Sequence, residues 1–202
     1  ELIVGGVEIF PAPDNPEALS WRTIFCKGKD IYSLEKFFQG PEHMKDIRLV
    51  ELATGNIGVF TRPQGEKGGR GKIGYTEVSS LNELSEDIIN DAPLLNQFHT
   101  DEWGGANEIH LLKNGKLGVL AHIAKFSNDG QDRHYAAAAF LLDPVSNDYS
   151  RMKMIACRDL FSEGHAKRPD LKDVIFSGGL KRLADGKAVL YAGAGDAEAH
   201  WL

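Results

Sequence analysis

A repeated hairpin pattern places the strongest constraint on how this chain can fold. Three segments share an apolar strand, a tight turn that ends in glycine, and a second apolar strand: KDIRLVELATGNIGVFTR (45–62), NEIHLLKNGKLGVLAH (107–122) and VIFSGGLKRLADGKAVLYAG (174–193). Asn114-Gly115 and Asp185-Gly186 are strong signals for two-residue hairpin turns. The turn glycines at positions 55, 115 and 186 give a period of 60 to 71 residues. A four-stranded antiparallel sheet repeated at this period is typical of a β-propeller blade.

Further strand candidates complete the pattern, at 71–78, 133–143 and 151–160 and near 2–10, 20–26 and 30–34. The segment 79–98 predicts one or two turns of helix, or a long connection between sheets. We therefore expect an all-β fold with a single β-propeller domain over residues 1–202, which supplies about three to four blades. Because a propeller closes only with four or more blades, we expect the chain to be a piece of a longer protein that lacks its N-terminal blade or blades.

Charge and cysteine content narrow the classes of partner. The net charge of -6 and the pI near 5.6 argue against nucleic acid or an anionic membrane surface as the main partner. No apolar run approaches the ~20 residues that a membrane span needs. Cys26 and Cys157, the two cysteines, fall in strand-like runs and are expected to be buried free thiols. The expected absence of a disulfide framework favours a cytoplasmic location.

Arg62 stands at an unusual place, directly after an apolar strand and before Pro63, which ends that strand. Position seven after each turn glycine is Arg62, His122 or Gly193. Folding each hairpin about its turn sets Asp46 opposite Arg62, and Asn107 opposite His122. In the third hairpin the same operation sets Ser177 or Gly178 opposite Gly193.

These positions lie at the open ends of the hairpins, which meet at one mouth in a propeller. A polar, net cationic cluster is then expected at this mouth, from Lys45, Asp46, Arg62, Asn107 and His122. Such a cluster suits an anion or a sugar. The alternative is an ordinary ion pair between Asp46 and Arg62, and a histidine whose hydrogen bonds are satisfied by its neighbours.

Other motifs are less specific. The loop GEKGGRGKIG (65–74) has the composition of a phosphate-binding loop without its Lys-Ser/Thr ending, and we interpret it as a flexible hairpin or lid loop. The histidines show no zinc-type spacing, so no metal site is expected. Trp103 precedes two glycines and is a candidate to stack on a pyranose ring. Trp103 and Tyr135 can equally be core aromatic residues.

Several stretches resemble the β-mannoside phosphorylases of glycoside hydrolase family 130. They are KDIRLVELATGNIGVFTRP, LGVLAH, RHYAAAAFLLD and VIFSGGLKRLADGKAVLYAGAGDAEAHW. The chain is more similar still to a relative of that family, domain-of-unknown-function family 1861, through MKDIRL, FTRPQG, EWGGANE and KRPDLKDVIFSGG. This resemblance covers most of the chain.

The resemblance implies a five-bladed β-propeller with its active site at the axial mouth. By position, Lys45, Arg62 and His122 would hold inorganic phosphate, a co-substrate, with no other cofactor. Asp196 would hydrogen-bond sugar hydroxyls. Phosphate would attack the anomeric carbon with inversion while a carboxylic acid protonates the leaving oxygen. The family's acid lies in an Asp-Pro motif that falls ahead of Glu1, so no catalytic residue is predicted within the chain.

We therefore expect a glycosidase-type enzyme that acts on a β-linked, mannoside-like sugar by phosphorolysis or hydrolysis. The residues expected to contact the sugar are Asp46, Trp103, Asn107, Tyr135 and Asp196. One departure from the family is that its further phosphate-binding lysine has no match near EWGGANE, where Asn107 stands instead. A non-catalytic carbohydrate-binding propeller and an interaction scaffold are the alternatives left open.

Overall fold

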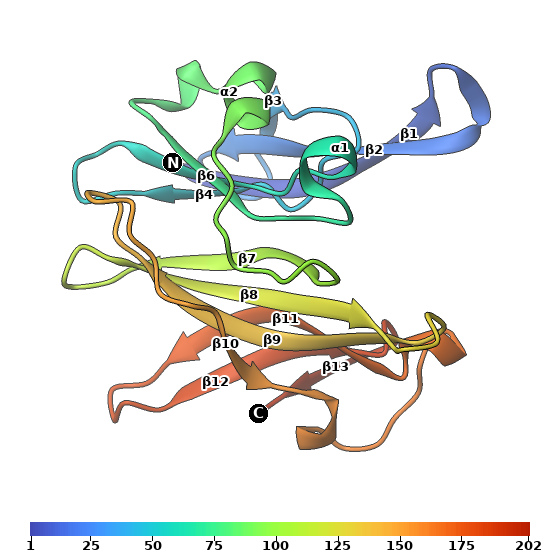
Figure 1. Ribbon diagram of the computed structural model, residues 1–202. Coiled ribbons are helices and arrows are strands. Elements are labelled where there is room, and N and C mark those ends of the chain that lie inside the picture. The colour runs from blue at the N-terminus through green and yellow to red at the C-terminus, as the bar shows by residue number, and fades with distance from the viewer. The chain divides into compact units, whose positions relative to one another are not determined.

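The computed structural model describes all residues from Glu1 to Leu202, and β-strands are its main regular structure (Figure 1). The chain divides into two compact units, Glu1–Leu95 and Asn96–Leu202. None of its helices has the length and apolar character needed to cross a membrane.

The first unit contains two three-stranded antiparallel sheets. One sheet has the order β1-β2-β3 and the other β4-β5-β6. The strands are β1 (Leu2–Ala12), β2 (Asn15–Gly28), β3 (Glu35–Gln39), β4 (Arg48–Glu51), β5 (Ile57–Thr61) and β6 (Gly74–Val78). The helical turns are α1 (Gly65–Gly68), the 3-10 turn η1 (Leu81–Glu83) and α2 (Glu86–Asp91).

The second unit contains one seven-stranded sheet of order β13-β12-β11-β9-β8-β7, with β10 paired to β9 as well (Figure 1). Its strands are β7 (Trp103–Leu111), β8 (Leu117–Phe126), β9 (Arg133–Leu142), β10 (Lys153–Ala156), β11 (Asp173–Arg182), β12 (Ala188–Ala194) and β13 (Glu198–Trp201). Short 3-10 turns, η2 (Arg158–Leu160) and η3 (Pro169–Leu171), lie before β11. All pairs are antiparallel except β9 with β11, which pair in parallel at only two positions. The sheet is therefore two antiparallel meanders, β7–β10 and β11–β13, joined by a short parallel contact.

The three predicted hairpins all form, and with the same turn. In the first, Leu52 N–H donates to Asn56 O at 2.8 Å and Gly55 N–H donates to Leu52 O at 3.0 Å. Equivalent bonds close the turns at 112–116 and 183–187. The turn glycines have φ of 87°, 80° and 85°, which only glycine adopts readily. The loops therefore have three residues, with glycine in the left-handed position, and the prediction of two-residue turns was wrong.

Two β-bulges shift the predicted register at the open ends. Arg48 pairs with Phe60, and the same register places Asp46 opposite Arg62, as predicted. In β7, a bulge between positions 106 and 108 leaves Gly105 opposite His122. In β11, a bulge between positions 177 and 179 leaves Phe176 opposite Gly193. The expected pairings of Asn107 with His122, and of Ser177 or Gly178 with Gly193, were therefore wrong. Each bulge inserts one residue into one strand, and the third residue of the turn adds a further shift to the pairing of Asn107.

Each unit has its own apolar core. In the first unit the buried cluster is Phe25, Met44, Ile47, Val59, Val78, Leu84 and Ile89. In the second unit it is Leu120, Ala137, Ala156, Phe161, Ile175, Leu190, Ala192 and Ala194. Four of the eight residues in the second cluster are alanines.

Three local predictions have different outcomes. The helical turns expected within 79–98 are confirmed, and Ser85 caps α2 by accepting a hydrogen bond from Ile88 N–H at 3.2 Å. The strand expected near 30–34 is instead a turn, because the Asp30 carboxylate accepts hydrogen bonds from Tyr32 and Ser33 N–H. The loop 65–74 is not simply a hairpin, since it contains α1. Both cysteines are free, as expected, but they are partly exposed and not buried.

Candidate functional site

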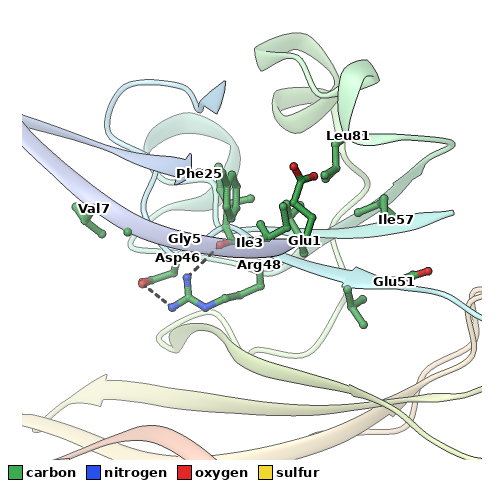
Figure 2. A pocket seen from close by; sticks show the side chains of 14 residues that line it. Glu1, Ile3, Gly5, Val7, Phe25, Asp46, Arg48, Glu51, Ile57 and Leu81 are labelled. Atoms are coloured by element: carbon green, nitrogen blue, oxygen red, sulfur yellow. Dashed lines mark hydrogen bonds and ion pairs between the residues drawn. The ribbon is translucent and has the colours of Figure 1, made fainter. Parts of the chain in front are cut away.

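Arg62 is a buried cation in the first unit, one residue beyond the end of β5. Its side chain is only 5% exposed, and Nη1 lies 3.4 Å from Asp46 Oδ2. Nη2 donates to the backbone oxygen of Arg70 at 3.4 Å. Asp46 also accepts from Arg48 Nη2 at 3.4 Å (Figure 2). Its carboxylate therefore contacts two guanidinium groups, those of Arg48 and Arg62. The ion pair between Asp46 and Arg62 that the alternative interpretation named is present.

The backbone around this ion pair has unusual conformations. Asp46 is buried and has φ of 64°, a left-handed conformation that a non-glycine residue rarely adopts. Gly71 has φ of 140°, and a Cβ built on it would lie 2.7–2.8 Å from the guanidinium of Arg62. The guanidinium therefore packs against bare backbone on one side. Lys45, the other predicted phosphate ligand of this unit, is exposed.

Replacing Gly71 by alanine is expected to push the Arg62 guanidinium away from its present position. The new methyl group would overlap the guanidinium, and φ of 140° would strain any side chain. We expect the free energy of unfolding to fall by about 1–3 kcal/mol, measured by denaturant titration. Gly69→Ala is the matched control, because Gly69 also has a positive φ but nothing lies within 4 Å of its built Cβ. Equal losses in the two variants would contradict the packing role given to Gly71.

His122 is a buried member of a hydrogen-bonded chain in the second unit. Its side chain projects from β8 and the residue is 1% exposed. Nδ1 lies 2.8 Å from Asn107 Oδ1. Asn107 Nδ2 donates to both the backbone oxygen and the hydroxyl of Ser177, at 2.7 Å each. The Ser177 hydroxyl donates to Ala121 O at 2.9 Å. The bulge at Asn107 thus connects β7 to β8 and β11.

Aromatic rings enclose this histidine. The Tyr135 ring stacks on the imidazole with centroids 5.8 Å apart and an angle of 10°, and Phe176 lies at 4.8 Å. Trp103 Nε1 donates to the Tyr135 hydroxyl at 3.0 Å. Trp103 is 4% exposed and packs on Phe126. A pyranose ring needs an open aromatic face, so the structure favours a core role for Trp103 over sugar stacking. Tyr135 is half-buried.

Asp196 lies in the turn between β12 and β13, is exposed, and has φ of 55°. The turn is attached to the loop before β11, since Lys167 N–H donates to Gly195 O at 2.8 Å. Glu198 accepts from His200 Nε2 at 2.9 Å and from His165 N–H at 3.1 Å. These two hydrogen bonds lower the pKa of the Glu198 carboxyl below its ordinary value, and the bond from His200 has the larger effect.

The predicted residues fall into separate groups. Asp46 and Arg62 are in contact in the first unit, and Asn107, His122, Tyr135 and Trp103 are in contact in the second. Asp196 belongs to the C-terminal turn of the second unit. A common opening for Lys45, Arg62 and His122 would join residues of both units, and it stays a prediction.

Two features of this arrangement were not predicted from the sequence: the packing of Gly71 against the Arg62 guanidinium, and the hydrogen bonds that Ser177 accepts from the Asn107 amide. The positive φ of Gly71 has no local sequence signal beyond the glycine itself. In the third hairpin, Ser177 occupies the position that Ala106, the residue before Asn107, occupies in the second hairpin. The register of the repeat therefore indicated a residue next to it. Its contact with Asn107 depends on a bulge, which the register does not predict.

A cavity of about 760 Å³ lies within the first unit (Figure 2). Most of its lining is apolar, and Asp46 and Arg48 are among the polar residues that line it. No group of three or more His, Cys, Asp or Glu side chains is arranged to hold a metal ion.

Two solved structures are similar to the chain over nearly its whole length. MPT-4, a mannose phosphorylase from Leishmania mexicana in complex with phosphate ion, has a TM-score of 0.87 and 33% identity, covering 98% of this chain and 61% of that chain. MPT-1, a GDP-Man-dependent mannosyltransferase from Leishmania mexicana, has a TM-score of 0.83 and 32% identity, covering 98% and 62%. The chain therefore spans about three fifths of the length of these carbohydrate-active enzymes.

A more distant structure and a family model complete the comparison. The endo-arabinase from Bacteroides thetaiotaomicron VPI-5482 has a TM-score of 0.51 and 15% identity, covering 91% of this chain and 69% of that chain, and this likeness concerns the fold alone. No curated protein sequence matches the chain. The model of the family described as "Protein of unknown function (DUF1861)" matches residues 1–202, and the chain belongs to that family.

Proposed function

We propose that this protein is a carbohydrate-active enzyme that transfers a β-linked, mannoside-like sugar to inorganic phosphate. One observation carries the proposal: two buried basic side chains, Arg62 and His122, occupy the same position after the turn glycine of two repeated hairpins. Each is held by a polar side chain of the preceding segment, Asp46 or Asn107. Such anchored cationic and hydrogen-bonding groups suit a phosphate.

Likeness to known enzymes supports the same activity. The mannose phosphorylase with 33% identity was solved with a phosphate ion, and the phosphorylase-like motifs of the sequence are those that carry Arg62, His122 and Asp196. We propose that the chain forms part of a five-bladed β-propeller and that Lys45, Arg62 and His122 bind the phosphate at its mouth. The two cysteines, both free, favour the cytoplasm as the place of this activity.

The proposed reaction exchanges one bond at the anomeric carbon for another. A phosphate oxygen attacks that carbon, the bond to the leaving oxygen breaks, and a carboxylic acid protonates the leaving oxygen, with inversion. Arg62, Lys45 and His122 offset the charge of the phosphate, and Asp196 binds sugar hydroxyls. The transition state resembles an oxocarbenium ion, so the main task of these groups is to position the phosphate.

The test is to incubate the full-length protein with β-mannosides, with and without phosphate, and to analyse the products. We expect a sugar 1-phosphate, formed only when phosphate is present. Free sugar released at the same rate without phosphate would show a hydrolase and contradict the proposal. Sugar binding without turnover would show a carbohydrate-binding propeller.

Mannosyl transfer from a nucleotide-activated donor is a second candidate, supported by the likeness to the GDP-Man-dependent mannosyltransferase at 32% identity. The same assay with GDP-mannose and a mannose acceptor separates the two. Release of GDP without any formation of sugar 1-phosphate would favour transfer.

A further inference from the structure

The side-chain amide of Asn107 can point in only one direction. Its Nδ2 lies 2.7 Å from the backbone oxygen of Ser177, which accepts hydrogen bonds and cannot donate them. A reversed amide would bring two acceptor oxygens to this distance. Nδ2 therefore faces Ser177, and Oδ1 faces His122.

This orientation determines where the imidazole of His122 carries its hydrogen. The amide oxygen of Asn107 is an acceptor only, and it lies 2.8 Å from Nδ1. Nδ1 must therefore carry a hydrogen in both the neutral and the charged ring, and Nε2 is the nitrogen that gains or loses a proton. The hydrogen bond made by one ring nitrogen sets the role of the other.

The same chain of bonds also fixes the ring in space. Ser177 holds Asn107, and its hydroxyl donates at 2.9 Å to Ala121, the residue before His122. The chain thus closes on the strand that carries the histidine. Tyr135 and Phe176 pack on the imidazole ring and restrict its rotation.

We propose that Asn107, oriented by the backbone oxygen of Ser177, is a positioning residue that keeps His122 in the Nδ1–H tautomer and directs Nε2 to the phosphate. This role rests on the proposed function for its ligand. With Nδ1 so engaged, Nε2 can accept a hydrogen from the phosphate monoanion or, once protonated from solvent, donate one to the dianion. Asn107 acts through the histidine and is not itself required to touch the phosphate.

The experiment is ¹⁵N NMR of the imidazole nitrogens in the full-length protein, at a pH where His122 is neutral. The His122→Gln variant, which lacks the signals, distinguishes them from those of the other histidines. We expect the wild-type protein to show a hydrogen-bearing Nδ1 and a bare Nε2. The opposite pattern in the wild-type protein, a bare Nδ1 and a hydrogen-bearing Nε2, would overturn the inference.

Two variants test the cause. Asn107→Leu removes the acceptor, and we expect loss of the Nδ1–H tautomer and a phosphate dissociation constant raised about tenfold or more. Ser177→Ala is the matched control, because it removes a buried hydroxyl but keeps the backbone oxygen that orients the amide. We expect it to keep the tautomer and to weaken phosphate binding by about fivefold at most.

The two proposals fail in different ways. An Nδ1–H tautomer that persists in Asn107→Leu would overturn the positioning role, even if phosphate binds. A wild-type protein that shows the tautomer but binds no phosphate by calorimetry would overturn the proposed function and, with it, the role given to Nε2.

Discussion

Replacing Arg62 by alanine is expected to raise the phosphate KM of the full-length protein by about tenfold or more. A hydrogen bond to a charged group contributes about 1.5–3 kcal/mol, and each factor of ten corresponds to about 1.4 kcal/mol. Arg62 is 4% exposed, so its guanidinium is already desolvated and held in place before phosphate arrives. Initial rates at a saturating β-mannoside, measured against phosphate concentration, give the KM.

A matched control separates this effect from a general loss of stability. Removing Arg62 also leaves the buried carboxylate of Asp46 without one of its partners, which costs stability. Arg22→Ala breaks another ion pair of the same unit, that with Glu8 at 2.7 Å, and is expected to leave the KM unchanged. An unchanged KM in Arg62→Ala would refute the phosphate role of this arginine.

Replacing Gly104 by alanine is expected to disrupt the second unit where His122 is anchored. A Cβ built on Gly104 would lie 2.1 Å from the backbone oxygen of His122 and 2.7 Å from the ring of Phe98. The backbone of a paired strand cannot move by the required distance without breaking the ladder between β7 and β8. We expect the free energy of unfolding to fall by more than about 3 kcal/mol, measured by urea titration, with a large loss of phosphate affinity.

Gly6→Ala in β1 is the control for this substitution, since nothing lies within 4 Å of its built Cβ. A change within about 0.5 kcal/mol is expected there. If Gly104→Ala were equally mild, the close approach of β7 to β8 at this position would be wrong.

The repeated hairpins could be predicted because their chemistry is local. A glycine after a short polar turn, followed by alternating side chains, sets the strand register by itself. This is why the contact between Asp46 and Arg62 follows from counting along the chain. The same counting placed His122 and Asn107 in one cluster. The predicted backbone pairing between them was wrong, because it left out the bulge in β7 and the third residue of the turn.

The remaining features depend on contacts far apart in the sequence. The bulge at Asn107 is stabilised by Ser177, 70 residues away, and no local pattern contains that contact. For Trp103 the sequence left a sugar-stacking role and a core role open, and the contacts with Phe126 and Tyr135 that favour the core role come from other strands. Closure of a β-propeller is a property of all its blades together. It stays a prediction for this chain, which spans 61% of the length of the mannose phosphorylase it resembles.

The most direct test of the account is a crystal structure of the full-length protein with bound phosphate. We predict one phosphate ion that contacts both the Arg62 guanidinium and the Nε2 atom of His122, at the end of a channel formed by the repeated hairpins. A structure in which these two side chains open onto separate surfaces, with the phosphate bound at neither or at only one, would contradict it.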